Sequence, residues 1–310
     1  MSTYHNWIRY AALVVGDHRW ECGPDEFDLR FTITKNQKSK PNKAEISIAN
    51  LTKASRSELT VTGASVRLEA GYVGNASTIF IGEITHATTE RWGRPRGQRG
   101  PYRATRDGGD VLSHVTARDA EKAFSRAYIN KSFAAGTPRW VAVQAIAQAL
   151  GLPIPKLQTD LVSGVYAGGA VLTGLASQHL DVLCRTLDLE WSIQDGTLQL
   201  LRIGAANMEP VVVLSPETGL LAIPGDVEDA VPRWQGRKKK KLAQQSSGLI
   251  KHRMSRIQRT CFLNPGLRVG RRVRLQEGQE QDGDYRVLEV QHSGDTRGED
   301  WKSVVVMGAL

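Results

Sequence analysis

Four acidic residues lie close together near the end of the sequence: Glu277, Glu280, Asp282 and Asp284. Two carboxyl groups held close together can act as acid and base, or as nucleophile, in glycoside hydrolysis. These four, however, lie in a glycine-containing segment between two expected strands, where acidic side chains commonly form turns by bonding nearby backbone amides. We therefore expect turn-forming residues here and no catalytic pair.

A second group, His179, Asp181 and Cys184, falls within about one turn of an expected helix. These residue types bind metals or form nucleophilic sites. Cys184 lies beside the apolar stripe of that helix and is interpreted as a small core side chain, while the other two point elsewhere. No second pair of ligands lies nearby in the sequence, and the catalytic patterns G-x-S-x-G, H-E-x-x-H and the P-loop are absent. We therefore expect no enzyme, no metal site and no cofactor.

Three tryptophans, Trp140, Trp191 and Trp301, could in principle form a platform for carbohydrate. Each of them fits the apolar face of its own segment at the local period of helix or strand. We therefore predict that they are core residues.

The strongest charge feature is the run Arg237, Lys238, Lys239, Lys240 and Lys241. Such a run repels itself, which favours a mobile loop, expected over residues 226–248. Three interpretations stay open: a solvated loop tip, a contact with an acidic partner, and a contact with DNA. No aromatic residues are interleaved to stack bases, so a groove for single strands is not favoured. Counterion release would still permit binding that is salt-sensitive and independent of DNA sequence.

The chain as a whole has 310 residues and a formal net charge of +9. Its length exceeds what one hydrophobic core usually serves, so two or three domains are expected. The charge permits attraction to nucleic acid or to an anionic protein surface but does not specify a fold. Cys22, Cys184 and Cys261 have unrelated spacings and are expected to be free thiols made in a reducing compartment. We expect no signal peptide and no membrane-spanning segment, because no run approaches the roughly 18 apolar residues required.

Alternation of apolar and polar residues predicts antiparallel strands in the first third of the chain. Phe27 to Ile33 is one such run. Pro41 to Tyr72 contains two more, joined by a helical turn at Thr52 to Leu59. Further strands are expected at 79–84 and 111–118. Five or more strands joined by tight turns are typical of a small barrel or sandwich.

The period changes after Asp119. Thr137 and Pro138 mark a helix start, with the threonine as N-cap and the proline at the first helical position, and Gly151 marks its end. A second helix is expected at 175–187, followed by a hairpin around Asp195-Gly196. Strands then return at 211–214, 257–263, 271–275, 285–292 and 301–307. The order along the chain is therefore β, then α+β, then β.

The organising stretch reads PNKAEISIANLTKASRSELTVTGASVRLEAGY at residues 41–72 and is followed by IFIGEI at 79–84. This run resembles the central baseplate hub protein of contractile-tailed bacteriophages. Later segments fit the same family: the helix and hairpin at 175–201, FLNPG at 262–266 leading to RRVRL at 271–275, and GDTRGEDW at 294–301. The resemblance covers most of the chain, and the order and spacing of the pieces carry it.

The resemblance implies a mainly β, multidomain fold with two antiparallel β-barrel domains of tail-tube type flanking an α+β domain. The corresponding ranges are 1–119, 120–205 and 206–310. It further implies a ring-shaped homotrimer whose six β modules match a six-fold tail tube, seat a trimeric spike and surround the channel. Implied partners are the spike, tail tube or tube-initiator proteins, other baseplate proteins and, transiently, genomic DNA in the lumen. The implied location is the baseplate of the virion, assembled in the cytoplasm of the bacterial host.

Two sets of residues are candidate interaction residues. Arg56 and Glu58 lie on the expected helical turn, which would be offered to a neighbouring subunit, and Arg237 to Lys241 form the basic run. Two other functions stay open. One is a basic DNA-binding accessory protein of a phage or mobile element. The other is a tail-associated cell-wall hydrolase, against which the missing acid and base pair argues.

Overall fold

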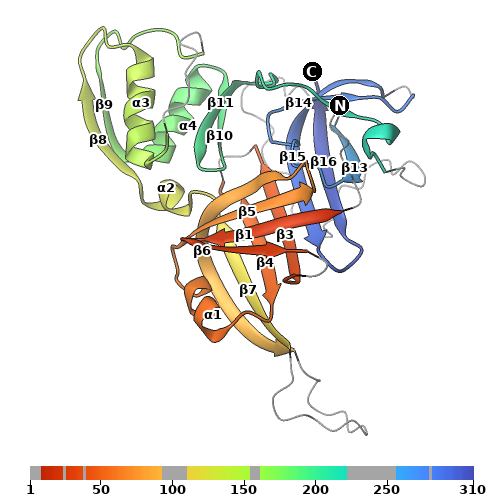
Figure 1. The fold of residues 1–310 in the computed structure, drawn as a ribbon. Helices are drawn as coiled ribbons and strands as arrows, with labels where there is room; N and C mark the ends of the chain where they lie inside the picture. Colours follow the sequence, from red (N-terminus) through yellow and green to blue (C-terminus); the bar gives the residue numbers. More distant parts are fainter. Residues whose placement is uncertain are drawn as a thin grey trace, which may run out of the picture.

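The computed structural model describes residues 8–23, 26–37, 40–92, 110–153, 161–221, 256–278 and 281–310. Strands dominate these residues, so the expected mainly β, multidomain fold is confirmed. Figure 1 shows a first β module, a lobe that contains the longer helices, and a second β module. None of the described helices is long and apolar enough to span a membrane.

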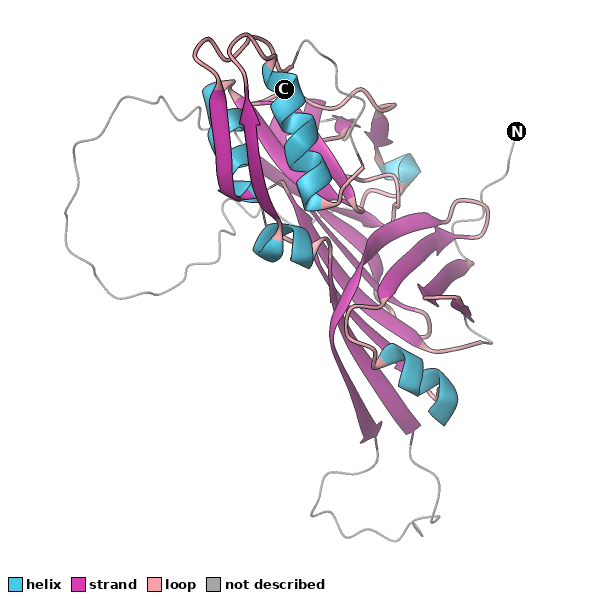
Figure 2. Cartoon of the chain, turned by 90° about the vertical axis from the view of Figure 1, so that its left-hand side faces the viewer, coloured by secondary structure: helices cyan, strands magenta, loops and turns pink. Residues whose placement is uncertain are grey.

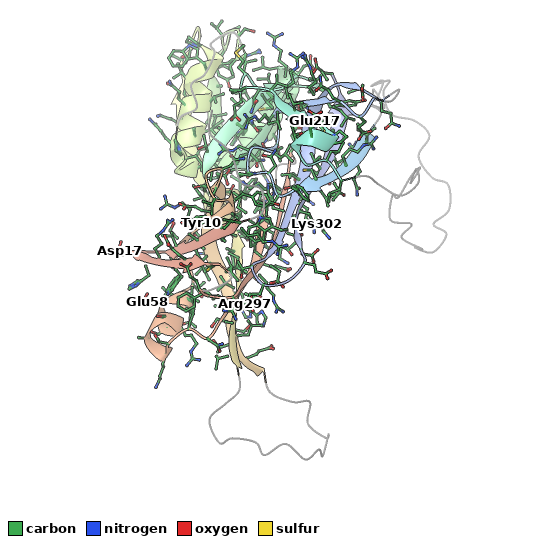
Figure 3. The ribbon with its side chains drawn as sticks, turned by 45° about the vertical axis from the view of Figure 1, so that its right-hand side comes forward. Tyr10, Asp17, Glu58, Glu217, Arg297 and Lys302 are labelled. Atoms are coloured by element: carbon green, nitrogen blue, oxygen red, sulfur yellow. The ribbon has the colours of Figure 1, made fainter. Side chains whose placement is uncertain are left out.

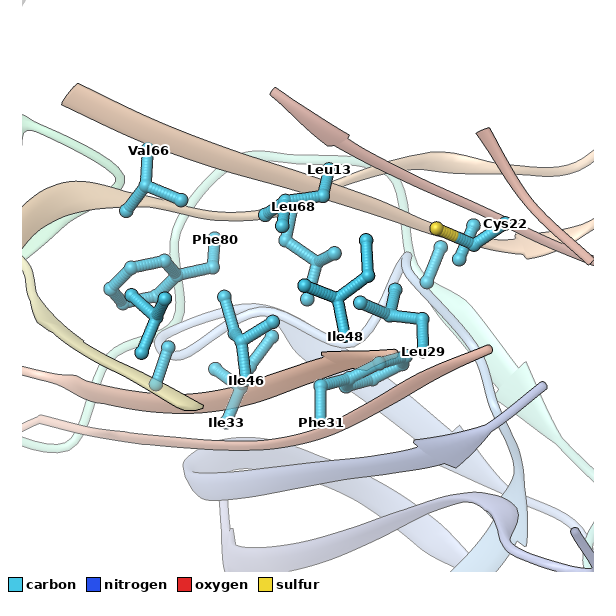
Figure 4. Close-up of a cluster of buried hydrophobic side chains, with 14 of the residues drawn as sticks. Leu13, Cys22, Leu29, Phe31, Ile33, Ile46, Ile48, Val66, Leu68 and Phe80 are labelled. Atoms are coloured by element: carbon cyan, nitrogen blue, oxygen red, sulfur yellow. The ribbon is translucent and has the colours of Figure 1, made fainter. Parts of the chain in front are cut away.

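The first β module buries one face of each strand, as the alternation predicted. Leu29, Phe31 and Ile33 are buried on one strand, and Ile46 and Ile48 are buried on the next. Figure 4 shows these side chains facing those of a second layer across a hydrophobic core. The elements are β1 (Arg9–Val15), β2 (His18–Cys22), β3 (Leu29–Asn36), β4 (Lys43–Ala49), α1 (Lys53–Leu59), β5 (Ser65–Tyr72), β6 (Ser77–Trp92) and β7 (Asp110–Arg118).

The corner between β4 and β5 is the helical turn expected at residues 52–59. Thr52 is the N-cap of α1, and its side chain accepts a hydrogen bond from the Ser55 backbone N–H at 3.2 Å. Leu59 at the end of the helix is 1% exposed and belongs to the core of the first β module. The cap and this one apolar anchor hold a helix too short to be stable by itself.

The α+β lobe has a core of its own, in which its two longer helices lie between two two-stranded sheets. Its second helix and the Asp195-Gly196 hairpin are as predicted, and Gly151 ends the first helix with a φ of 69°. The predicted N-cap is wrong by one residue: Pro138 caps the helix, and the Thr137 C=O instead accepts from the Tyr166 N–H at 2.9 Å. The elements are α2 (Glu121–Arg126), β8 (Tyr128–Phe133), α3 (Arg139–Leu150), β9 (Ala170–Leu175), α4 (Ala176–Thr186), β10 (Leu189–Gln194) and β11 (Thr197–Arg202).

The second β module has a third, separate core, which includes Val273, Val287 and Val305. Its strands follow the order β12-β14-β15-β16-β13. An isolated bridge between Leu220 and Cys261 brings the segment after β12 beside β13. The elements are β12 (Val212–Leu214), the 3-10 turn η1 (Pro216–Thr218), β13 (Arg256–Phe262), β14 (Arg272–Leu275), β15 (Gly283–Asp295) and β16 (Trp301–Ala309).

The two β modules share one sheet, because β3 pairs with β15 from Asn36↔Glu289 to Arg30↔Asp295. Trp301, 4% exposed, belongs to the core of the first module although β16 belongs to the second. Gly294 lies against the rings of Phe31 and Trp301, where a Cβ atom would collide with both. Among the described strands neither module closes into a barrel, so they are two parts of one open sheet. The domain boundaries stay a prediction.

Candidate assembly surfaces

The tip of the β10–β11 hairpin docks on the first β module through buried polar groups. The Nζ atom of Lys35, whose side chain is 3% exposed, lies 2.5 Å from Oδ1 of Asp195. The side-chain amide of Asn42 donates to the backbone oxygen of Ile193 at 2.9 Å. The Asp195-Gly196 turn, from which the hairpin was predicted, therefore also attaches the lobe to the sheet, because Asp195 pairs with Lys35.

Asp119, at the end of the first module, completes this junction. Its Oδ1 accepts a hydrogen bond from the Gly196 N–H at 3.1 Å, and the residue is 1% exposed. Burial, and then the nearby Asp195 carboxylate, raise the pKa of Asp119 to about 6, while Lys35 acts in the opposite direction. Two carboxyl groups thus share one ammonium group, so the charge of the junction changes near pH 6.

A second tie connects the lobe to the second β module. The guanidinium of Arg286 on β15, only 5% exposed, forms an ion pair with Glu190 on β10. The same group donates to the backbone oxygen of Ala205 at 2.8 Å. The lobe is therefore held to both β modules by charged side chains.

These junction residues were not identified from the sequence. The available signal was the position of Lys35, which shares a strand face with Leu29, Phe31 and Ile33. A charged residue on an otherwise buried strand face must find a partner of opposite charge. The pattern therefore predicts that Lys35 has an acidic partner. It does not identify Asp195 as that partner, because Asp195 is distant in the sequence.

Helix α1 carries Arg56 and Glu58, the two candidate interaction residues that the structure describes. Both side chains are half-buried, and Oε2 of Glu58 lies 2.9 Å from Nε2 of His18. Figure 3 shows Glu58 close to Asp17, in the turn between β1 and β2. The structure thus joins α1 to the β1–β2 hairpin, and contact with a neighbouring subunit stays a prediction. The basic run Arg237 to Lys241 and the expected loop at 226–248 lie outside the described residues.

Two of the strand edges that face no further described strand along most of their length lie in the first β module. β2 pairs along its length with β1, and on its other side the described residues give it one isolated bridge, between Cys22 and Phe27. β6 pairs with β5 as far as Glu83 and beyond that point with β7 alone. Figure 2 shows this end of β6 and β7 extending away from the body as a two-stranded arm beside α1. Open edges can accept a strand from a neighbouring chain.

The acidic residues near the end of the chain have structural partners. Glu277 pairs with Arg259 at 2.5 Å, and both side chains are largely buried. Asp282 accepts hydrogen bonds from the two backbone N–H groups that begin the turn, which confirms its predicted turn role. Hydrogen bonds from two arginines hold the pKa of Asp284 well below its usual range. Glu280 lies outside the described residues.

The three residues on α4 also have separate structural surroundings. Asp181 accepts a hydrogen bond from Nε1 of Trp191 at 2.7 Å, and Nε2 of His179 lies 3.1 Å from the Thr173 oxygen. Cys184 is buried in the lobe core, where burial raises its pKa to about 12. The described residues contain no group of three or more His, Cys, Asp or Glu side chains that could hold a metal ion.

The remaining expectations concern the tryptophans and cysteines. Trp191 and Trp301 are buried, as predicted, and Trp140 packs against the lobe core while partly exposed. All three cysteines are free, as predicted from their spacing, and all three are buried.

Comparison with known proteins is informative at the level of the fold. No protein-family model matches the sequence, and no curated protein matches it either. The 43 kDa tail protein of prophage MuSo2 from Shewanella oneidensis is 11% identical, with 97% of each chain covered and a TM-score of 0.61. A tail protein from Neisseria meningitidis MC58 is 13% identical over 98% of this chain and 97% of that chain, with a TM-score of 0.58.

A third similar structure comes from a secretion system. The E. coli c3393 protein is 12% identical over 96% of this chain and 76% of its own, with a TM-score of 0.53. It is described as a component of the type VI secretion system with structural similarity to the T4 bacteriophage tail proteins gp27 and gp5. At these identities the likeness shows the fold: it is the mainly β fold of phage tail proteins, as the hub resemblance predicted, but the described strands do not form the two closed barrels that were expected.

Proposed function

We propose that this chain, which has the fold of phage tail proteins, is a structural baseplate hub. Three copies form a ring at the tail tip that joins a six-fold tail tube to a trimeric central spike and surrounds the channel. The observation that carries the proposal is the presence of two β modules, each with its own apolar core, side by side in one sheet. Three chains contribute six such modules, which matches the symmetry of the tube.

The ring is formed by heterologous contacts, in which one surface of a chain meets a different surface of the next. The open edge of β2, the β6–β7 arm and α1 with Arg56 and Glu58 are the surfaces available for this. The proposed partners are the spike, tail tube or tube-initiator proteins, other baseplate proteins and DNA in transit. The proposed location is the virion baseplate, assembled in the bacterial cytoplasm.

The role proposed is architectural and not enzymatic. Glu277 and Asp284, the strongest acidic candidates, are both engaged by arginines. A carboxyl group whose pKa is held low by two arginines is a poor general acid. Zymography on peptidoglycan is expected to show no clearing zone, and clearing that depends on either residue would support a hydrolase instead.

The test of the hub is assembly with the spike. The purified chain is mixed with its trimeric spike and analysed by size-exclusion chromatography with light scattering, and the peak by negative-stain microscopy. The expected product contains three chains per spike trimer and is ring-shaped in end view. The chain by itself can be a monomer, so the spike must be present. A chain that stays monomeric and joins neither spike nor tube would overturn the proposal.

The net charge of +9 favours one competing function, that of a DNA-binding accessory protein. Replacing Lys238, Lys239, Lys240 and Lys241 by glutamine separates the two. A DNA mobility shift that is lost in this variant and weakens with salt, with assembly unchanged, would favour the competing function. Absence of any shift at low salt removes it.

A further inference from the structure

The α+β lobe is joined to the two β modules in different ways. Among the described residues, its apolar core includes no side chain of the first module, and the core of the first module includes none of the lobe. Against the second module β11 packs closely, because a Cβ atom added to Gly270 would lie 2.8 Å from Leu201 and 2.9 Å from Gln199. The Asn207 N–H also bonds to the Gly270 oxygen at 2.7 Å. The lobe is thus packed against the second module, whereas its junction with the first depends on polar groups.

The chain crosses from the first module into the lobe at this polar junction. Asp119 directly follows β7, and its N–H bonds to the Asn42 oxygen at 3.1 Å. The next residue, Ala120, caps α2 with a φ of 51°, in the left-handed region that few residues other than glycine adopt. A residue at the end of an element can absorb the backbone rotation of a hinge. Ala120 therefore suits a hinge between sheet and lobe, and Asp119 lies directly beside it.

The carboxyl group of Asp119 is only half satisfied. Its Oδ1 accepts a hydrogen bond from the Gly196 N–H at the tip of the β10–β11 hairpin. Its Oδ2 is buried and has no hydrogen-bond partner among the described residues. Burial without a partner costs a charged carboxylate far more than it costs a neutral carboxyl group. The buried position therefore favours the protonated form, and the pKa of Asp119 is raised to about 6.

The charged groups around this carboxyl group come from three other elements. Asp195 in the hairpin turn repels the ionised form and Lys35 on β3 attracts it, but Lys35 is already paired with Asp195. His292 on β15 lies near Lys35, and because burial lowers its pKa to about 3, it is neutral above pH 5. The adjacent Arg118 is paired with the first residue of α2. Ionisation therefore leaves two negative charges with one positive charge in a buried junction, and protonation makes the junction neutral.

We propose that the proton on Asp119 controls the docking of the α+β lobe on the first β module. When Asp119 is protonated, the hairpin tip stays on the module. When Asp119 is ionised, the tip lifts away by rotation about Ala120, while the lobe stays folded and in contact with the second module. Acidic solution thus fixes the lobe, and neutral solution frees it. The proposal goes beyond the hub role and does not depend on ring formation.

The direction of the effect follows from the two states of the carboxyl group. The docked group has a pKa of about 6, whereas a released and solvated aspartate has a pKa of about 3.9. Docking is therefore strongest below pH 4 and weakens as the pH rises through 6. Between pH 5 and pH 8 the docking equilibrium is expected to weaken about tenfold, with most of the loss complete by about pH 6.5.

The test measures hydrogen exchange of the full chain by NMR from pH 5 to pH 8, with each rate corrected for the intrinsic rate at that pH. Two groups report on docking from opposite sides of the junction: the Gly196 amide of the lobe and the side-chain amide of Asn42 in the first module. Their protection is expected to fall together by about tenfold. The Ile203 amide, which bonds to the Asp188 oxygen inside the lobe, reports on lobe folding. At pH 8 it is expected to be about tenfold better protected than Gly196.

Asp119→Asn removes the titration, because asparagine is neutral at every pH and keeps an oxygen that can accept from the Gly196 N–H. Its Gly196 protection is expected to be the same at pH 5 and pH 8. The matched control is Asp188→Asn, the same change at an exposed aspartate of the lobe whose φ of 53° asparagine tolerates. This variant is expected to retain the tenfold dependence on pH. Circular dichroism compares the folding of both variants with that of the unsubstituted chain.

Equal protection of Gly196 at pH 5 and pH 8 in the unsubstituted chain overturns the proposal, and this result needs no variant to fold. Loss of protection at Gly196 without loss at Asn42 does the same, since only the turn would then open. A pH dependence that survives Asp119→Asn also overturns it. So does equal protection of Gly196 and Ile203 at pH 8, because the lobe would then unfold instead of lifting away.

Discussion

Two joints hold the first β module to the rest of the chain, and they use different chemical groups. The joint with the second β module is a backbone ladder between β3 and β15, with Trp301 as an apolar anchor. The joint with the α+β lobe is a set of side chains, chiefly Lys35, Asp195 and Asp119. One joint thus depends on strand register and the other on the identity of a few polar residues.

The difference predicts how each joint responds to change. Backbone amides do not titrate, and almost any residue except proline can supply them, so the ladder tolerates pH and surface substitution. Buried carboxyl and ammonium groups are sensitive to pH and to substitution, because their pairing is stabilising only when both partners are present and oppositely charged. The lobe is therefore the part expected to move relative to a rigid two-module sheet.

The largest effect is expected from Trp301→Ala, which removes the anchor of the ladder joint. The ring of Trp301 packs edge-on against Phe31 at 5.6 Å, and its Nε1–H donates to the Gly71 oxygen at 3.2 Å. Truncating a buried tryptophan is expected to lower the free energy of unfolding by about 3 to 5 kcal/mol. Urea denaturation followed by circular dichroism measures this.

Tyr128→Ala is the matched control for this loss, because Tyr128 is an aromatic residue 71% exposed on β8. Its free energy of unfolding is expected to change by less than about 0.5 kcal/mol. A loss below about 1 kcal/mol for Trp301→Ala would show that the anchor is dispensable.

The next effect is expected from Lys35→Met. The change leaves the Asp195 and Asp119 carboxyl groups together without their cation, at an expected cost of about 3 kcal/mol. Hydrogen exchange is expected to show the lobe loosened while amides of the β3–β15 ladder keep their protection. The double variant Lys35→Met with Asp195→Asn is expected to recover part of the loss. Equal loosening of ladder and lobe would contradict the separation of the two joints.

A smaller effect is expected from pH, through Asp119. Its folded-state pKa is about 6, against about 3.9 for an unperturbed aspartate. The folded state therefore binds the proton more tightly, so stability is greatest below pH 4 in this respect and falls as pH rises through 6. The expected loss between pH 4 and pH 7 is about 2 kcal/mol from this group.

The difference between the chain and its Asp119→Asn variant isolates this effect. His292, fully buried with its pKa lowered to about 3, contributes in the opposite direction over an overlapping pH range in both proteins. Urea denaturation at each pH is expected to give a difference curve that changes between pH 4 and 7. A flat difference curve would rule out titration of Asp119.

The smallest effect on stability is expected outside both joints. Exchanging the charges on α1, by Arg56→Glu with Glu58→Arg, removes the contact between Glu58 and His18. A partly exposed pair of this kind contributes at most about 1 kcal/mol, so the monomer is expected to stay folded. Ring assembly with the spike is expected to decrease, measured by light scattering. Full assembly would remove α1 from the proposed subunit contact.

The sequence predicts local features well where the pattern is local. Ile46 and Ile48 alternate with polar residues, and Asp195-Gly196 supplies the positive φ angles of 52° and 75° that a tight hairpin requires. The β1–β2 hairpin was not predicted, although Gly16-Asp17 lies between its strands and gave the same kind of signal.

The two joints could not be predicted in this way. The β3–β15 pairing joins segments far apart in the chain, and the residues of neither strand indicate which strand it pairs with. The turn role of Asp282 was predicted, but the arginines that pair with Glu277 and Asp284 could not be assigned from one sequence, because the packing of distant strands brings them there.

The ladder joint also sets the order in which the chain can fold. The Leu29 N–H bonds to the side chain of Thr296, a separation of 267 residues, and the first module receives Trp301 from the same distant hairpin. When the ribosome has synthesised β1 to β7, it has not yet synthesised Thr296 or Trp301. Contacts between such distant segments form slowly, since a long loop must close first. During synthesis the edge of β3 therefore stays unpaired, and the core of the first module lacks Trp301, until β15 and β16 have been made. Exposed strand edges and exposed apolar side chains make newly synthesised chains prone to aggregate.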